Sequence, residues 1–246
     1  MALALSKTNI ESQLTSRFGD IFKLNERRFA EVISTGIPEV DSLTNGLPRG
    51  AITEVFGPAS SGRTSLILAA LAYATNHDEV CALIDTSNAF DPTSATSAQM
   101  DLDQLLWVRC DGKLEHAFKA SDLVLQGGGF GLVVLDLGDI PSQQARKIIS
   151  SWWYRFRRVV EDKPTAFVVI AADSCVRSCA SLSLEVNKVG ATWSSMKTPA
   201  STSSPFVSST SFPATGLLQG IKFHTERQRP VYLGTREICF KAYISF

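Results

Sequence analysis

Apolar runs that alternate with helical stretches dominate the middle of the chain. Three of these runs, at 80–86, 131–137 and 165–173, carry an aspartate at or next to their last residue. The stretches 113–126 and 142–160 between them have apolar side chains at helical spacing. Strands that are apolar on both faces and separated by helices are typical of a parallel sheet covered on both sides. We therefore predict an α/β fold with a mainly parallel central sheet flanked by helices, and a site at the carboxyl ends of its strands.

The two ends of the chain follow different patterns. Residues 1–33 place apolar side chains at helical spacing and predict an amphipathic helix that packs on its own domain or docks on a partner. A core domain is expected over 34–246. Within it, the Ser/Thr/Pro-rich segment 194–215 predicts a mobile loop. The alternating segments 220–227 and 236–246 predict a closing β-hairpin.

Composition narrows the classes of function. The chain has 246 residues, of which 44% are hydrophobic, and its 24 basic and 24 acidic residues cancel. A domain that binds DNA non-specifically by itself usually carries a positive excess, so the balance weighs against that function without excluding a local patch. No apolar run approaches the roughly 18 residues of a membrane span, and we expect a cytoplasmic protein without membrane contact. The five cysteines form no CxxC pair and are expected to be reduced thiols rather than zinc ligands.

The sharpest motif is a phosphate loop between the predicted strand 51–57 and the predicted helix 64–75. Its glycines let backbone N–H groups turn inward around an anion, and the following helix adds the positive end of its dipole. The alternative is a Gly- and Ser-rich turn without a ligand. The predicted nucleotide-binding residues of the loop are Gly57, Pro58, Ala59, Ser60, Ser61, Gly62, Arg63, Thr64 and Ser65.

Two side chains indicate a site for Mg²⁺, the metal that accompanies ATP. Thr64 offers a hydroxyl to Mg²⁺, and Asp136, near the end of the run 131–137, offers the matching carboxylate. Arg63 stands where the motif has lysine. Arginine is longer and planar, and it prefers two parallel contacts, so the two residues are not interchangeable. We expect phosphate binding to survive this change better than the accurate positioning of a transition state.

Five segments together resemble the bacterial RecA family. Residues 34–65 are similar to the opening of the RecA ATPase core, 81–92 to its next strand and loop, and 131–136 to its Walker B strand. The segments 179–191 and 220–246 resemble the end of the core. The resemblance implies a RecA-like P-loop core that takes ATP with Mg²⁺.

Carried over residue by residue, the resemblance also implies losses. Ser87 stands where the family has its catalytic glutamate, and a serine cannot polarise water as a carboxylate does. Asp91 matches an aspartate near the adenine, but Ser94 replaces the aromatic that stacks on the base. Asp173 replaces the sensor glutamine, and Ala59 replaces an acidic residue of the loop. We therefore name no catalytic residue and predict a degraded ATPase that binds ATP with little hydrolysis.

The DNA-contacting loops that the resemblance implies are short, at 136–144 and 174–178. We also expect the protein to lack the C-terminal domain usual in the family. This trimmed pattern resembles the ImuA family, the RecA-like accessory of a translesion-synthesis cassette. The resemblance implies a role in DNA repair and the SOS response through contacts with RecA or an ImuB-like polymerase component, with homo-oligomerisation left open. In the segment 152–158, aromatics and arginines alternate. These side chains either contact single-stranded DNA or a partner protein, or they belong to an amphipathic helix whose aromatics lie in the core.

The alternative function is a DNA-dependent ATPase and recombinase of the RecA type that binds single-stranded DNA. A core ATPase of the KaiC or RadA type is a third hypothesis, which the motifs at 57–65 and 81–92 make less favourable.

Overall fold

The computed structural model describes residues 31–145, 147–193, 218–230 and 237–243. From Val32 onward, the described residues belong to one compact unit. The predicted helical segment at 1–33 lies almost wholly outside the described residues, and the predicted loop at 194–215 lies outside them altogether. Both remain predictions, as does the domain boundary after residue 33.

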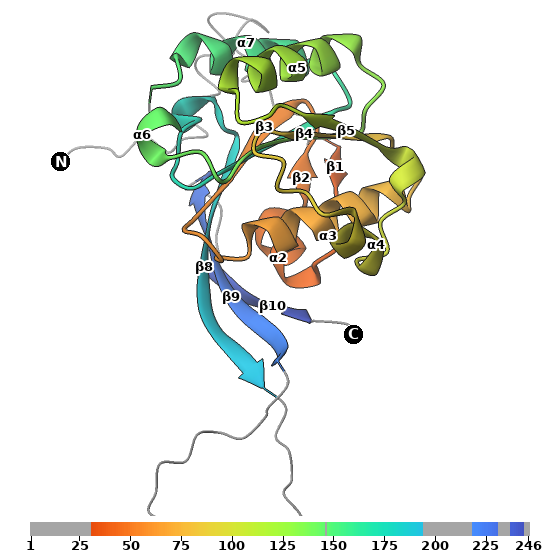
Figure 1. Cartoon of the computed structure of the whole chain (residues 1–246), viewed down its shortest axis with the longest axis vertical. Helices are drawn as coiled ribbons and strands as arrows, with labels where there is room; N and C mark the ends of the chain where they lie inside the picture. Colours follow the sequence, from red (N-terminus) through yellow and green to blue (C-terminus); the bar gives the residue numbers. More distant parts are fainter. Residues whose placement is uncertain (1–30, 146, 194–217, 231–236, 244–246) are drawn as a thin grey trace, which may run out of the picture. The chain divides into compact units, whose positions relative to one another are not determined.

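An eight-stranded mixed sheet forms the centre of this unit (Figure 1). Its strands in spatial order are β10 (Glu237–Tyr243), β9 (Leu218–Arg229), β8 (Leu182–Trp193), β3 (Ala51–Phe56), β7 (Ala166–Ala171), β6 (Leu132–Leu137), β4 (Cys81–Asp85) and β5 (Leu105–Arg109). Neighbours from β8 to β5 run parallel, whereas β9 is antiparallel to both β8 and β10. The predicted α/β class, mainly parallel sheet and closing hairpin are confirmed.

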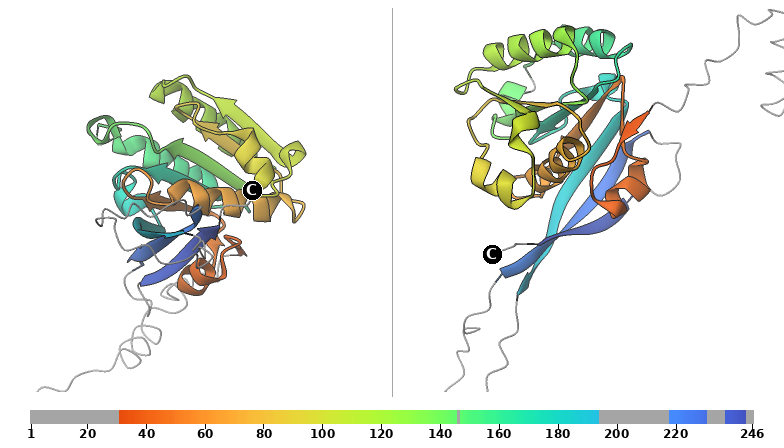
Figure 2. Two further views of the ribbon diagram at one scale, coloured as in Figure 1. Left: turned by 60° about the horizontal axis from the view of Figure 1, so that its bottom comes forward. Right: turned by 90° about the vertical axis from the view of Figure 1, so that its right-hand side faces the viewer.

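Helices lie on both faces of the sheet (Figures 1 and 2). On one face, α5 (Leu114–Gly127) and α7 (Ser150–Val160) cover a cluster of buried side chains from β6 and β7. On the other face, α2 (Pro38–Thr44) and α3 (Arg63–Thr75) cover a second cluster that extends to β8, β9 and β10. The short elements are β1 (Val32–Ile33), β2 (Leu47–Pro48), α4 (Pro92–Ser97), α6 (Ser142–Ala145) and the 3₁₀ turns Leu102–Gln104 and Arg177–Cys179.

The prediction of one helical segment over 142–160 was wrong, because these residues form two helices, α6 and α7. After α6, the N–H groups of Lys147 and Ile148 donate to the carbonyls of Gln144 and Ala145, which closes a tight turn. Ile149 then adopts an extended conformation, at φ −66° and ψ 126°, before α7 begins. The apolar pattern continues through the break because Ala145 and Ile148 both still pack against the core.

Strands β8 and β9 extend beyond the rest of the sheet (Figure 1). Residues Thr53–Phe56 of β3 pair with residues Leu182–Glu185 of β8. The later part of β8 pairs with β9 alone. Phe223 of β9 and Phe240 of β10 lie directly opposite each other, with ring centroids 5.3 Å apart, and both are buried. The hairpin therefore adds an apolar surface beside the end of β3, where the phosphate loop begins.

The aromatic side chains of α7 divide between the core and the surface. Trp153 and Phe156 are 2% and 0% exposed, and their rings pack against each other and against Phe118 of α5. Tyr154 is 56% exposed, and Arg155 donates from Nε to Asp122 on α5 at 2.8 Å. The interpretation that places these aromatics in the core is confirmed for Trp153 and Phe156, so neither ring is available to stack on DNA.

No helix in the described parts of the chain is both long enough and apolar enough to cross a membrane.

We expect Phe156→Ala to lower the free energy of unfolding by about 3–5 kcal/mol, because it empties space between Phe118, Trp153 and Phe167. The neighbouring Tyr154→Ala removes an exposed ring and should change the free energy of unfolding by less than about 0.5 kcal/mol. Urea denaturation followed by circular dichroism measures both values. Equal losses for the two variants would contradict this placement of α7.

Candidate functional site

The predicted phosphate loop connects β3 to α3. Its first residue, Gly57, donates its N–H to the carbonyl of Ala171 at 3.3 Å, which ties the loop to the end of β7. Ser60 has a left-handed backbone at φ 59°, and Gly62 caps α3 at φ 99°. Because α3 is a 13-residue helix, the free N–H groups and the positive dipole end at its start can attract an anion.

Strands β8 and β9 pack tightly against this loop. A Cβ added to Gly57 would lie 2.0 Å from the carbonyl oxygen of Val186, and one added to Gly62 would lie 2.6 Å from the ring of Phe223. Ser61 is 1% exposed, and its hydroxyl has no hydrogen-bond partner among the described residues. The loop therefore has a fixed shape and contains one buried donor without a partner.

Arg63, the residue in the lysine position, turns its guanidinium into the protein. It is 8% exposed and donates from Nη1 to the carbonyl of Ala171, at the end of β7. Nη2 donates to the carbonyl of Gly138, just after β6, at 3.4 Å. Burial lowers the pKa of Arg63, and the negative charges of Asp136 and Asp139 oppose that shift. The guanidinium thus bridges the carboxyl ends of two neighbouring strands.

Asp136 lies near the end of β6, as predicted. Burial raises the pKa of its carboxyl group to about 6, while a hydrogen bond from the N–H of Gly138 and the charge of Arg63 act in the opposite direction. That hydrogen bond measures 2.7 Å, from the Gly138 nitrogen to Oδ1. One carboxylate oxygen is therefore already used by the chain itself.

A small cavity of about 80 Å³ brings several predicted residues together beside the loop. Apolar side chains of α3, β4 and β7 form part of its wall, with Phe90 from the loop after β4. Its polar lining residues are Arg63, Thr64, Asp136, Gly138 and Asp139. The phosphate loop and the predicted metal ligands thus meet at one place.

Asp91, the predicted contact to adenine, does not line this cavity. It is exposed and caps α4, accepting hydrogen bonds from the N–H groups of Thr93 and Ser94 and from the Ser94 hydroxyl. The Ser94 hydroxyl contributes most to lowering the pKa of Asp91. Its carboxylate therefore has a structural task in this conformation, and its role towards adenine remains a prediction.

Two carboxylates organise the loops around the site, and sequence reasoning missed their tasks. Asp85 accepts hydrogen bonds from the N–H groups of Ala89 and Phe90 and from the indole of Trp107. It thereby shapes the loop that carries Ser87. Ser87 is exposed, and a serine provides no carboxylate to the cavity.

Glu54 lies in the middle of β3 and is 1% exposed. It accepts hydrogen bonds from the N–H groups of Cys175 and Val176 at 2.6 and 2.7 Å, and from the hydroxyl of Ser174 at 2.8 Å. This carboxylate holds the short connection from β7 to β8 in place. A single acid inside the apolar strand AITEVF was the signal in the sequence.

A resident Mg²⁺ does not fit this set of donors well. At nucleotide sites, magnesium is usually held in octahedral geometry by one or two carboxylates together with substrate phosphates and waters. Here the cavity offers the Thr64 hydroxyl, the exposed Asp139 and the carboxylate of Asp136, one oxygen of which is already engaged. A buried guanidinium already lies beside them. Within the described ranges, no three His, Cys, Asp or Glu side chains are placed to hold a metal ion. The metal site at Thr64 and Asp136 therefore remains only a prediction.

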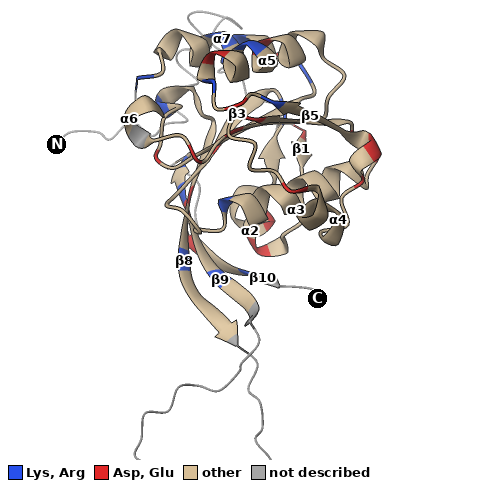
Figure 3. Cartoon of the chain, in the orientation of Figure 1, with Lys and Arg blue, Asp and Glu red and all other residues tan. Residues whose placement is uncertain are grey.

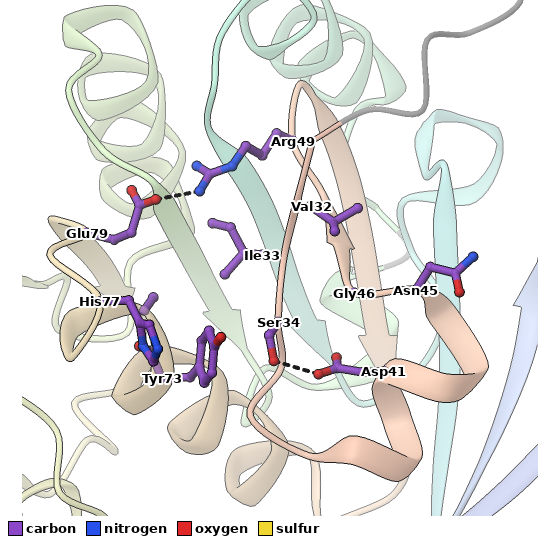
Figure 4. A pocket seen from close by; sticks show the side chains of 11 residues that line it. Val32, Ile33, Ser34, Asp41, Asn45, Gly46, Arg49, Tyr73, His77 and Glu79 are labelled. Atoms are coloured by element: carbon purple, nitrogen blue, oxygen red, sulfur yellow. Dashed lines mark hydrogen bonds and ion pairs between the residues drawn. The ribbon is translucent and has the colours of Figure 1, made fainter.

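A larger hollow than this cavity lies elsewhere in the described unit (Figure 4). It measures about 530 Å³ and borders Tyr73 and His77, near the carboxyl end of α3, whereas the phosphate loop precedes its amino end. Arg49 and Glu79 form an ion pair on its wall, and Ser34 donates to Asp41 at 2.5 Å. None of the predicted site residues borders it.

Comparison with known protein families matches residues 1–142, more than half of the chain, to the RecA N-terminal domain. The chain belongs to the RecA family. It is also similar to the protein RecA of Laribacter hongkongensis (strain HLHK9), with 36% identity over 140 residues. That stretch covers 55% of this chain and 39% of the relative, so the chain spans less than half the length of that RecA protein. Membership of the RecA family confirms the coarser part of the predicted resemblance.

We expect Gly57→Ala to destabilise the protein by at least about 1–3 kcal/mol, because the new methyl group would meet the backbone of β8. Gly127→Ala, at the end of α5, is the matched control, because a Cβ there meets nothing within 4 Å. The control should leave stability unchanged or raise it by up to about 1 kcal/mol. Thermal unfolding of both variants measures the difference, and a stable Gly57→Ala protein would show that the loop is not packed as described.

Proposed function

We propose that this RecA-family protein is an accessory factor of DNA repair and damage tolerance, of the ImuA type. It binds a nucleotide at the phosphate loop with little hydrolysis and acts in translesion synthesis through contacts with RecA or an ImuB-like polymerase component.

The position of Arg63 carries this proposal. A residue that assists phosphoryl transfer must be placed at the transferring group, but two donors of this guanidinium are fixed to the carbonyls of Ala171 and Gly138, which leaves only its remaining N–H bonds for a phosphate. Ser87 adds no carboxylate that could orient an attacking water. Binding and turnover are separable here, because the N–H groups of the loop can hold a phosphate without either function.

The surroundings of the sheet ends favour a role through protein contacts. The connection from β7 to β8 is short and is held by Glu54. Basic and acidic residues are interspersed along the described elements (Figure 3), whereas DNA-binding surfaces carry a basic patch or stripe. These features favour a protein partner over a DNA strand as the main contact.

An apolar groove between α5 and α7 offers a surface for such a partner. It has a volume of about 360 Å³ and borders Phe118, Ile148 and Trp152. Ile149, which also lines it, is 68% exposed. An apolar groove with an exposed apolar side chain is typical of protein–protein contact sites.

A steady-state ATPase assay, with and without single-stranded DNA, tests the function. We expect no turnover above the buffer blank under either condition, because neither Arg63 nor Ser87 can support the transition state. Asp136→Ala is the control for contaminating ATPases and should not change the signal. DNA-stimulated turnover that Asp136→Ala abolishes would instead establish a recombinase-type ATPase.

A further inference from the structure

Arg63 places a permanent positive charge beside the carboxylate of Asp136. The guanidinium is 8% exposed and bridges the ends of β6 and β7 through two backbone carbonyls. Asp136 and Asp139 stabilise its charged form against the cost of burial. Because the two carbonyls hold it in the folded chain, this cation is part of the site before any ligand arrives.

The same position is poor for a divalent cation. Asp136 already accepts the N–H of Gly138 through one oxygen, and neither Ala59 nor Ser87 adds a carboxylate. A metal ion placed between Thr64 and Asp136 would also be repelled by the fixed charge of Arg63. Without a metal, the cavity already holds one fixed cation, Arg63, together with two carboxylates, Asp136 and the exposed Asp139.

The donors that remain suit phosphate oxygens. Two N–H bonds of the guanidinium are used, out of the five that arginine offers. The start of α3 adds free backbone N–H groups and its dipole, and Thr64 adds an exposed hydroxyl. The hydroxyl of Ser61 is buried in the loop without a partner among the described residues.

We propose that Arg63 is the resident cation of this site and takes the place of Mg²⁺, so that the site binds the terminal phosphates of a nucleoside di- or triphosphate without a divalent metal. This inference rests on the proposed nucleotide binding and adds that the binding does not require a divalent metal. Binding without turnover then follows from Ser87, which provides no carboxylate to orient an attacking water.

The test is a polarisation titration with a fluorescent ATP analogue, in excess MgCl₂ and in excess EDTA at equal ionic strength. We expect the wild-type Kd values to agree within about threefold between the two buffers. Arg63→Lys shortens the side chain and removes the bridge, so its binding should become at least about tenfold tighter with Mg²⁺ than with EDTA.

Two further variants locate the effect. Arg49→Lys is the matched control, because Arg49 also donates to a backbone carbonyl and to an acid, but borders the hollow at the other end of α3. Its two Kd values should agree as those of the wild type do. Thr64→Glu places a negative charge at the start of α3, where an acid favours the helix and repels phosphate, and should abolish binding.

The outcomes separate the two proposals. Wild-type binding that weakens about tenfold or more in EDTA overturns the metal-independent site but leaves nucleotide binding intact. Absence of binding in both buffers overturns both. Unchanged binding by Thr64→Glu places the ligand elsewhere and overturns the assignment of the site. The wild-type comparison requires no variant, so a failure of Arg63→Lys to fold does not prevent a decision.

Discussion

A buried guanidinium ties together the carboxyl ends of two central strands, and the character of the site depends on it. In a parallel sheet these ends carry the residues that meet a ligand. Here Arg63 reaches across them, from the start of α3 to the carbonyls of Ala171 on β7 and Gly138 after β6. A buried cation needs counter-charges, and Asp136 and Asp139 supply them. The carboxylate that would attract a metal thus also offsets part of the cost of burying the guanidinium.

The strands that follow the parallel part of the sheet hold the phosphate loop from its other side. Val186 of β8 and Phe223 of β9 pack against Gly57 and Gly62 so closely that neither glycine has room for a side chain. Glu54 fixes the connection that leads into β8 through backbone N–H groups. The loop, the strand ends and the hairpin are therefore packed against one another.

Local patterns were enough to predict the parallel core. Three apolar runs separated by helical segments became β4, β6 and β7, because a strand buried on both faces must be apolar at every position. The break between α6 and α7 escaped prediction, because Ala145 and Ile148 remain in the core on either side of the turn. Asp91 matched a family position, yet its carboxylate caps α4, a task that depends on the conformation of its own neighbours.

The sequence by itself determined the fold class, the position of the predicted phosphate loop and the residues in it that differ from the family, since these follow from residue type and spacing along the chain. Only the tertiary structure decided where the side chain of Arg63 points and which groups Glu54 and Asp85 hold. Those partners are distant along the chain: Arg63 is 108 residues from Ala171, and Glu54 is 121 residues from Cys175. A long side chain has many rotamers, and the burial and charge of such distant neighbours select among them.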